Sequence, residues 1–389
     1  MRRYLKTVSA VVILSLLLCL LASCKKAGTE LADLMIIQGI GIDVSDNGYK
    51  VTVEILNNEQ SGSPGGEGAG ENKTKIYTAE GDTVAQALRT LITKSGNEPL
   101  FAHNRVIVIG DGASNRRLSD IIDFFIRDYD SRASQLLCVA RDMDAEDVIR
   151  ANLLDDTVKS EILENMLEES YNQSLAPRVR LVDAVNIIKS ETSVLCIPAV
   201  TVTKNGENED YKLSGCAVYG GDETFSSYIS EGDAEGIAFL TDEINEGYFS
   251  VELLNGEKAS FLINKGKTHF NISRNGNGLL YKLNIEISCD MEEVYGAEYF
   301  STDDDFFNKL NESVEKAIIK KCENTIAVLK GEHGGDAIRF GDRLRLADYD
   351  EYKVRRNNWQ EEFRNIKTIL SVDVTIRRIG EETFHSRKQ

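Results

Sequence analysis

The feature that most constrains this chain is an apolar segment near its N-terminus that ends at a cysteine. Residues Val8–Ala22 are apolar apart from two serines, and they follow the basic residues Arg2, Arg3 and Lys6. A helix that crosses the roughly 30 Å hydrocarbon core needs about 20 apolar residues, and this run is shorter. A basic start followed by such a run is typical of a signal peptide. We therefore predict that residues 1–23 are removed and that the rest of the chain folds outside the cytoplasm.

The end of this segment, Leu21-Ala22-Ser23-Cys24, fits the bacterial lipobox, in which small residues precede a cysteine. Cleavage is predicted between Ser23 and Cys24. The thiolate of Cys24 is the nucleophile that can accept a diacylglyceryl group. An ordinary signal peptide with a chance cysteine is the alternative, but the basic start, the length of the run and the lipobox agree with one another. Two or more acyl chains are sufficient for stable anchoring, so we expect a membrane-tethered lipoprotein.

The charge of the remaining chain excludes two kinds of binding. The 366 residues from Cys24 onward contain 42 Lys and Arg against 63 Asp and Glu, a net charge of −21. Such a chain does not bind nucleic acid by neutralising phosphates. Its soluble part is not attracted to an anionic membrane surface either. The lipid must therefore provide the anchor.

The length and the changing periodicity predict a multi-domain α+β fold, with mixed β-sheets and helices packed against them. Strands and helices alternate over residues 24–195, which predicts an N-terminal α/β-type domain. Short apolar runs separated by glycines predict a small β-rich middle domain over residues 196–250, with a strand at Glu235–Glu243. Longer alternating strands and one long helix predict a C-terminal α+β domain over residues 251–389.

Two local patterns predict particular elements in the N-terminal domain. Two apolar runs flank Asn47-Gly48, which predicts a β-hairpin with its turn there. Val84, Ala87, Leu88 and Leu91 recur at helical spacing, and we expect Asp82 to cap that helix.

The cysteines and histidines give no catalytic or metal-binding pattern. Beyond Cys24 the chain has five scattered cysteines, and we expect most to be buried thiols: Cys138, Cys196, Cys216, Cys289 and Cys322. A disulfide between Cys196 and Cys216 across neighbouring strands is a less favoured alternative. The four histidines lack the spacing of a zinc site. His103 is interpreted as a side chain that hydrogen-bonds a neighbouring loop, with ligand contact as the alternative. We expect no enzyme, cofactor or metal.

Taken in order along the chain, several segments resemble the Ger(x)C family, the lipoprotein C subunits of spore germinant receptors. The lipobox is followed by a Gly-Ile-Asp strand segment at residues 41–43, and the closing segments "GDAIRFGDRLR" and "NNWQEEFRNIKTILSVDVTIRRIG" are similar to the family's C-terminal signature. The residues that stand where the family shows such residues are Gly41, Asp43, His103, Arg127, Arg132, Gly341, Trp359, Phe363 and Gly380.

The resemblance implies a non-catalytic subunit, held by its lipid on the outer leaflet of the inner spore membrane. Its partners would be the A and B membrane subunits of a germinant receptor, and the complex would start nutrient-triggered germination. The contacts would then be made through surfaces, among them exposed sheet edges and the Gly-rich loop at residues 63–70. One alternative is a solute-binding lipoprotein that feeds a transporter, which predicts two similar α/β lobes around a hinge. Another is a tethered cell-wall enzyme, which requires clustered acids or metal ligands.

Overall fold

The structure is a computed structural model. It describes Tyr4 and residues 34–46, 48–57, 73–153, 157–252, 258–295, 304–331 and 334–377. The predicted cleavage site at Ser23 and Cys24, the loop at residues 63–70 and Gly380 lie outside the described residues.

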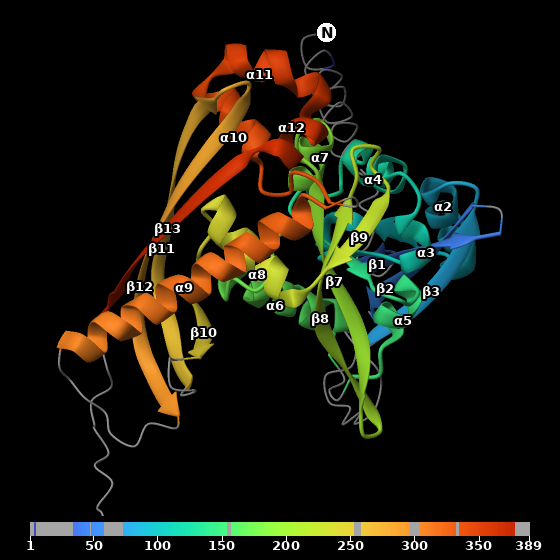
Figure 1. The fold of residues 1–389 in the computed structure, drawn as a ribbon. Helices are drawn as coiled ribbons and strands as arrows, with labels where there is room; N and C mark the ends of the chain where they lie inside the picture. The colour runs from blue at the N-terminus through green and yellow to red at the C-terminus, as the bar shows by residue number, and fades with distance from the viewer. Residues whose placement is uncertain are drawn as a thin grey trace, which may run out of the picture.

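The first part of the chain builds a large mixed sheet with helices on both faces (Figure 1). In the described residues this sheet has nine strands in the order β3-β2-β1-β5-β6-β7-β8-β9, with β4 paired to β1. Strands β1, β5, β6 and β7 are parallel neighbours, and the other pairings along this order are antiparallel. Its strands are β1 (Leu34–Ser45), β2 (Gly48–Leu56), β3 (Thr74–Gly81), β4 (Glu98–Leu100), β5 (Val106–Ile109), β6 (Leu136–Ala140), β7 (Leu195–Asn205), β8 (Asn208–Tyr219) and β9 (Phe225–Ile229).

The helical segments of this part connect the strands and cover the sheet. They are α2 (Val84–Ser95), η3 (Phe101–His103), α3 (Asp111–Ser114), α4 (Leu118–Arg127), α5 (Ala145–Arg150), α6 (Lys159–Asn172) and α7 (Leu181–Ile188). Helices α2, α4 and α7 contribute to one core, and α5 and α6 to the core on the opposite face. Alternate residues of the strands point to the two faces, so both faces can be covered by helices.

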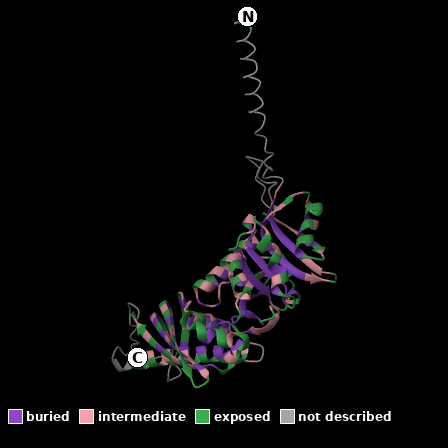
Figure 2. Ribbon diagram, turned by 90° about the horizontal axis from the view of Figure 1, so that it is seen from above, coloured by how far each residue is buried: buried purple, intermediate pink, exposed green. Residues whose placement is uncertain are grey.

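The second part of the chain forms a separate sheet with the order β10-β11-β12-β13. β10 (Gly247–Glu252), β11 (Lys258–Asn275) and β12 (Gly278–Tyr295) are antiparallel, and β13 (Lys367–Ile376) is parallel to β12. The helical segments of this part are α8 (Glu231–Thr241), α9 (Asp304–Leu329), α10 (Phe340–Ala347), α11 (Tyr349–Arg355), η4 (Arg356–Asn358) and α12 (Trp359–Asn365). The long helix α9 runs across the strands of this sheet (Figure 1). Buried positions follow the central strands, and exposed positions follow the outer helical surfaces (Figure 2).

The predicted α+β class is confirmed. The predicted hairpin is present as β1 and β2, but its predicted turn at Asn47-Gly48 was wrong, because Gly48 pairs with Ser45 and already belongs to β2. The helix predicted after it is present as α2, with its four spaced apolar residues buried, but the cap prediction was wrong. Thr83 caps α2 in place of Asp82, and its hydroxyl accepts the Gln86 N–H at 3.2 Å.

The strand predicted at residues 235–243 is a helix, α8. A short apolar run does not distinguish a strand from a buried helix. In this segment the residues at the two ends favour the helix. The Ser230 hydroxyl accepts the Asp233 N–H at 3.2 Å at the start of α8, and Asp242 closes its end with a left-handed backbone, φ 64°.

The strands of the predicted middle domain are divided between the two sheets. Strands β7–β9 extend the first sheet, whereas β10 begins the second. The predicted boundaries at residues 195 and 250 stay a prediction, because a sheet order does not define domains. The five cysteines beyond Cys24 are buried free thiols, as predicted, and Cys196 and Cys216 lie on the neighbouring strands β7 and β8.

Candidate functional site: a cavity between the two sheets

The N-terminal motif residues Gly41 and Asp43 attach α5 to β1. Asp43 is 2% exposed, and its carboxyl accepts the Ala145 N–H at 2.7 Å and the Glu146 N–H at 3.0 Å. Burial raises the pKa of this carboxyl to about 6, although the two backbone donors act in the opposite direction. At Gly41 a Cβ would lie 3.1 Å from atoms of Ala145 and Ile149, so the missing side chain lets α5 approach the strand closely. These two residues therefore have a structural role.

The C-terminal motif residues converge on a buried carboxylate that sequence reasoning did not single out, Asp336. Its oxygens accept the N–H groups of Phe340 and Gly341 at 2.9 and 2.7 Å, and the Trp359 indole Nε1–H at 2.9 Å. Burial raises the pKa of the Asp336 carboxyl to about 6. Phe363 is fully buried, and its ring centroid lies 6.1 Å from that of Phe340. A signal was present in the sequence, because Asp336 lies within the closing segment and a few residues before a helix.

The remaining predicted site residues are on the surface. His103 and Arg132 are exposed, and the hydrogen bond expected for the His103 side chain is not formed with any residue that the structure describes. Arg127 is 77% exposed and pairs with Asp123, with 2.8 Å between Nε and Oδ2. None of the three lines the cavity described next. The structure does not gather them into one site.

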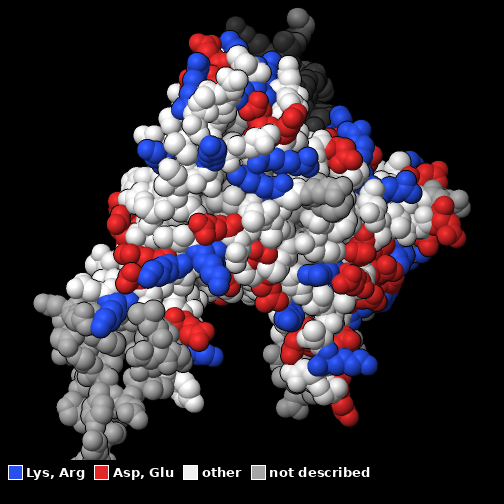
Figure 3. Space-filling view, viewed as in Figure 1, with Lys and Arg blue, Asp and Glu red and all other residues white. Residues whose placement is uncertain are grey.

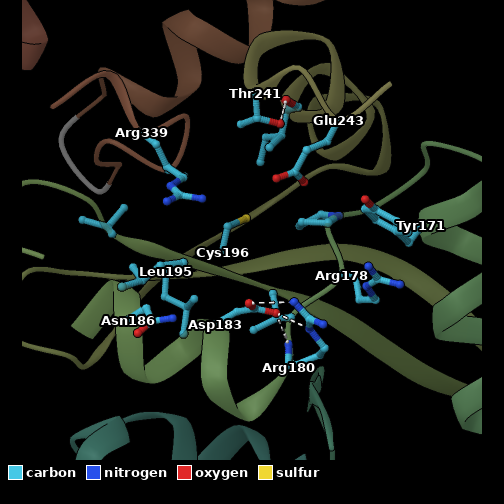
Figure 4. A pocket seen from close by; sticks show the side chains of 16 residues that line it. Tyr171, Arg178, Arg180, Asp183, Asn186, Leu195, Cys196, Thr241, Glu243 and Arg339 are labelled. Atoms are coloured by element: carbon cyan, nitrogen blue, oxygen red, sulfur yellow. Dashed lines mark hydrogen bonds and ion pairs between the residues drawn. The ribbon is translucent and has the colours of Figure 1, made fainter. Parts of the chain in front are cut away.

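A cavity of about 210 Å³ lies where the two parts of the molecule meet (Figure 4). One side is formed by the chain from the end of α6 through α7 to the start of β7, and the other by α8 and the connection between α9 and α10. The charged residues that line it are Arg178, Arg180, Asp183, Glu243 and Arg339. Ligand sites occur preferentially at such junctions between structural units.

Two of the three arginines in the cavity wall are held by neighbours on the same side. Arg180 precedes α7 and donates to Asp183 from Nε at 2.8 Å and from Nη2 at 3.1 Å. Arg178 donates to Glu168 at 3.1 Å, and its guanidinium carbon lies 4.3 Å from the centroid of the Tyr171 ring. These pairs leave this wall close to neutral.

Glu243 and Arg339 approach the cavity from its other side (Figure 4). The Glu243 N–H donates to the Ala238 carbonyl at 3.0 Å, which fixes this residue just after α8. Its carboxylate makes no hydrogen bond or ion pair within the described chain, and burial raises its pKa against the opposite effect of the Arg339 guanidinium. Arg339 has a left-handed backbone, φ 60°, and its Nε–H donates to Asp342 at 3.3 Å.

Sequence reasoning did not find this cavity. Arg339 lies far from Glu243 in the sequence, and the segment that carries Glu243 was predicted as a strand. The left-handed conformation of an arginine has no sequence signature, since glycine and asparagine are the residues that usually adopt it. Cys196, which was predicted to be a buried thiol with a disulfide as the alternative, lines the cavity as well.

Two further observations concern membrane spans and metal ligands among the described residues. No described helix combines the length and the apolar character that a membrane span requires. Within the described residues, no three His, Cys, Asp or Glu side chains are grouped so as to hold a metal ion. The cavity offers charged donors and acceptors at its walls, which is an arrangement suited to binding.

Comparison with known proteins finds family matches for both parts of the chain. Residues 28–202 match the family described as spore germination protein N-terminal domain, and residues 214–380 match the family described as spore germination B3/GerAC like, C-terminal. The chain belongs to the Ger(x)C family. The motif residues of the Ger(x)C resemblance all lie within the ranges that the two family domains match. All of them except Gly380 are among the described residues.

Curated Ger(x)C relatives match over nearly their whole length. Spore germination protein KC of Bacillus subtilis (strain 168) is 22% identical, with 90% of this chain and 91% of the relative covered. Spore germination protein B3 of the same organism is also 22% identical, with 97% and 98% covered. The crystal structure of the GerBC protein superposes with a TM-score of 0.58 at 20% identity, covering 87% of this chain and 96% of that chain. That likeness supports a shared fold.

Proposed function

We propose that this protein is a non-catalytic, lipid-anchored subunit of a spore nutrient germinant receptor. The observation that supports it most is the pair of spore germination family matches, which together extend from residue 28 to residue 380. Residues 1–24 supply the second support, because they combine a basic start, an apolar run and a lipobox that ends at Cys24. The protein would be attached through Cys24 to the outer leaflet of the inner spore membrane.

In this proposal the soluble part contacts the A and B membrane subunits of the receptor. Each sheet ends in strands that have one unpaired edge among the described strands, β3 and β9 in the first sheet and β10 and β13 in the second. An unpaired edge offers backbone donors and acceptors to an added strand. Acidic and basic side chains are interspersed over the face shown in Figure 3, so charge alone does not select a contact surface there.

The solute-binding lipoprotein is less well supported. It predicts two similar α/β lobes, whereas the first sheet here is mixed with helices on both faces and the second is a four-stranded sheet with a different strand order.

The experiment is membrane fractionation and germination of dormant spores that carry the wild-type protein, Cys24→Ala or Cys19→Ala. Cys19 lies five residues earlier in the same apolar run and is a matched control. We expect Cys24→Ala to leave the inner membrane fraction, because stable anchoring requires the acyl chains. Nutrient germination should fall with it, while a receptor-independent trigger still works and Cys19→Ala behaves as wild type. Crosslinking in wild-type spores should capture a transporter-like neighbour. Deletion without any effect on nutrient germination would contradict the proposed function.

A further inference from the structure

The cavity between the two sheets presents one cation and one anion that do not pair with each other. In Figure 4 the Arg339 guanidinium and the Glu243 carboxylate both point into the open space, from different elements. Arg339 stands at the start of α10, and Glu243 follows the end of α8. No ion pair joins them in the described structure, although the charge of Arg339 acts on the titration of Glu243.

Leaving the Glu243 carboxylate without a partner is unfavourable for the protein alone, whereas Arg339 is paired through Nε with Asp342 and its terminal N–H groups make no bond to a described residue. A carboxylate removed from water without a partner is destabilising. A non-glycine residue with a left-handed backbone adds about 1 kcal/mol or more of strain, and such strain persists where the surrounding structure imposes it. Arg339 carries that conformation at φ 60°. A bound molecule that supplied an ammonium group to Glu243 and a carboxylate to the terminal N–H groups of Arg339 would offset the cost of the unpaired carboxylate.

We propose that this cavity binds a small zwitterion of the α-amino-acid type. Its carboxylate would accept hydrogen bonds from the Arg339 guanidinium, whose planar donor fork matches a carboxylate. Its ammonium group would donate to the Glu243 carboxylate. A simple cation would pair with Glu243 alone and a simple anion with Arg339 alone, so neither would use both groups.

The rest of the lining agrees with a ligand of this size and polarity. The Arg180–Asp183 pair is internally neutralised and adds no net charge. Val194, Cys196 and Ile237 line the cavity and offer apolar surface to a short side chain. The volume of about 210 Å³ accommodates a few heavy atoms beyond the two charged groups. This volume is below the usual range of about 300–1,000 Å³ for pockets that hold drug-sized molecules.

Binding would link the two parts of the molecule, because Glu243 and Arg339 face a wall formed by α7 and β7 of the first sheet. Occupancy of the cavity would therefore stabilise this junction by mass action. A role for this ligand-dependent stabilisation in germination rests on the proposed function, whereas the binding itself is a property of the isolated chain.

The test is binding to the purified full chain. Each of the twenty amino acids that occur in proteins is added at about 10 mM, a concentration that detects millimolar affinity. Binding is measured first by thermal unfolding and then by titration calorimetry. Acetate and methylammonium serve as probes that carry one charge each. We expect at least one amino acid to raise the unfolding temperature and to bind, while the two single-charge probes do not.

Two variants assign the binding to the cavity. Glu243→Gln and Arg339→Gly should each weaken amino-acid binding at least about tenfold, since each removes one charge-assisted contact. Glycine accepts the left-handed backbone at position 339, so Arg339→Gly should fold at least as well as the wild type. Glu246→Gln and Arg345→Ala, exposed charges near each of the two residues, are matched controls that should bind normally.

Three outcomes would overturn the inference. They are the absence of binding by any amino acid, binding that survives in both cavity variants, and acetate binding as tight as that of the amino acid with no effect of Glu243→Gln. None of these results bears on the proposed function, which is tested by deletion in spores. A deletion without a germination defect would in turn leave the binding result intact.

Discussion

At the scale of single residues, buried carboxylates that lie outside a helix stabilise its start. Asp43 accepts the first N–H groups of α5, and Asp336 those of α10. Glu54 on β2 accepts the N–H groups of Lys159 and Ser160 at the start of α6, at 2.9 and 2.8 Å. The first N–H groups of a helix lack partners within it, and the helix dipole favours negative charge there. Each carboxylate therefore satisfies a helix end, and Asp43 and Glu54 also attach that helix to a strand.

The first prediction concerns the pH dependence that Asp336 gives to stability. Its pKa is raised by burial from 3.8 to about 6, so between these values the folded protein retains a proton that the unfolded chain has released. The contribution of Asp336 to the free energy of unfolding is therefore greatest below pH 4 and falls as the pH rises to 6. Asp336→Asn does not titrate. The stability of the wild type relative to this variant should decrease over that range and stay constant above it.

Urea unfolding of both proteins at several pH values between 4 and 7 measures this difference. Because the other acidic groups are common to both proteins, the comparison isolates Asp336. A relative stability that increases from pH 4 to 6 would mean that the three N–H donors outweigh desolvation and lower the pKa of this carboxyl.

At the scale of elements, the contact between α8 and α9 depends on a glycine. A Cβ at Gly236 would lie 1.9 Å from Thr325 Oγ1 and 2.9 Å from Thr325 Cβ. Thr325 is fully buried, and its hydroxyl donates to carbonyl oxygens of both helices, at Asp233 and Lys321. The Lys321 ammonium also pairs with Glu235 of α8. The absence of a side chain at Gly236 thus lets the two helices approach closely.

Gly236→Ala should consequently destabilise the protein by about 1–3 kcal/mol, as overpacking of a core does. The sign of the stability change is informative, because intrinsic helix propensity favours alanine over glycine by about 1 kcal/mol and alone would predict stabilisation. Gly232→Ala, one turn earlier in α8, is the matched control, since the nearest atom to its Cβ would be 4.0 Å away. We expect this control to be neutral or slightly stabilising in thermal unfolding. Equal stabilisation by both changes would show that α8 does not contact α9 at Gly236.

Elements with strong local signals could be predicted from the sequence, and their arrangement could not. The hairpin at β1 and β2 and the helix α2 follow from alternation, spacing and turn residues. Helix α8 was mistaken for a strand because its apolar run is short, and its ends depend on the Ser230 cap and on the left-handed Asp242. The motif residues Gly341 and Trp359 were found, but their shared partner Asp336 required the tertiary structure. The cavity was missed because its charged residues meet only after both sheets have formed.

At the scale of the whole molecule, strands of the first sheet belong to two cores. Cys216 and Val218 of β8 lie in the core that also contains the second sheet and α9, whereas Ala217 and Tyr219 lie in the core under α2, α4 and α7. Successive side chains of a strand point to opposite faces, so one strand contributes to both cores. Leu195 and Cys196 at the start of β7 divide between the two cores in the same way. The two sheets are thus joined through a shared hydrophobic core and not only through a surface contact.

This arrangement predicts that the described parts unfold together, in one cooperative transition. The single tryptophan, Trp359, is 2% exposed and lies in α12, so its fluorescence reports on the C-terminal part. Far-UV circular dichroism reports on the whole chain, and the two urea transitions should coincide. Val218→Ala should lower both midpoints equally, because it removes buried surface from the shared core at a cost of about 1–3 kcal/mol. A tryptophan transition at lower urea than the dichroism transition would mean that the C-terminal part unfolds independently, and the shared core would then not couple the two sheets.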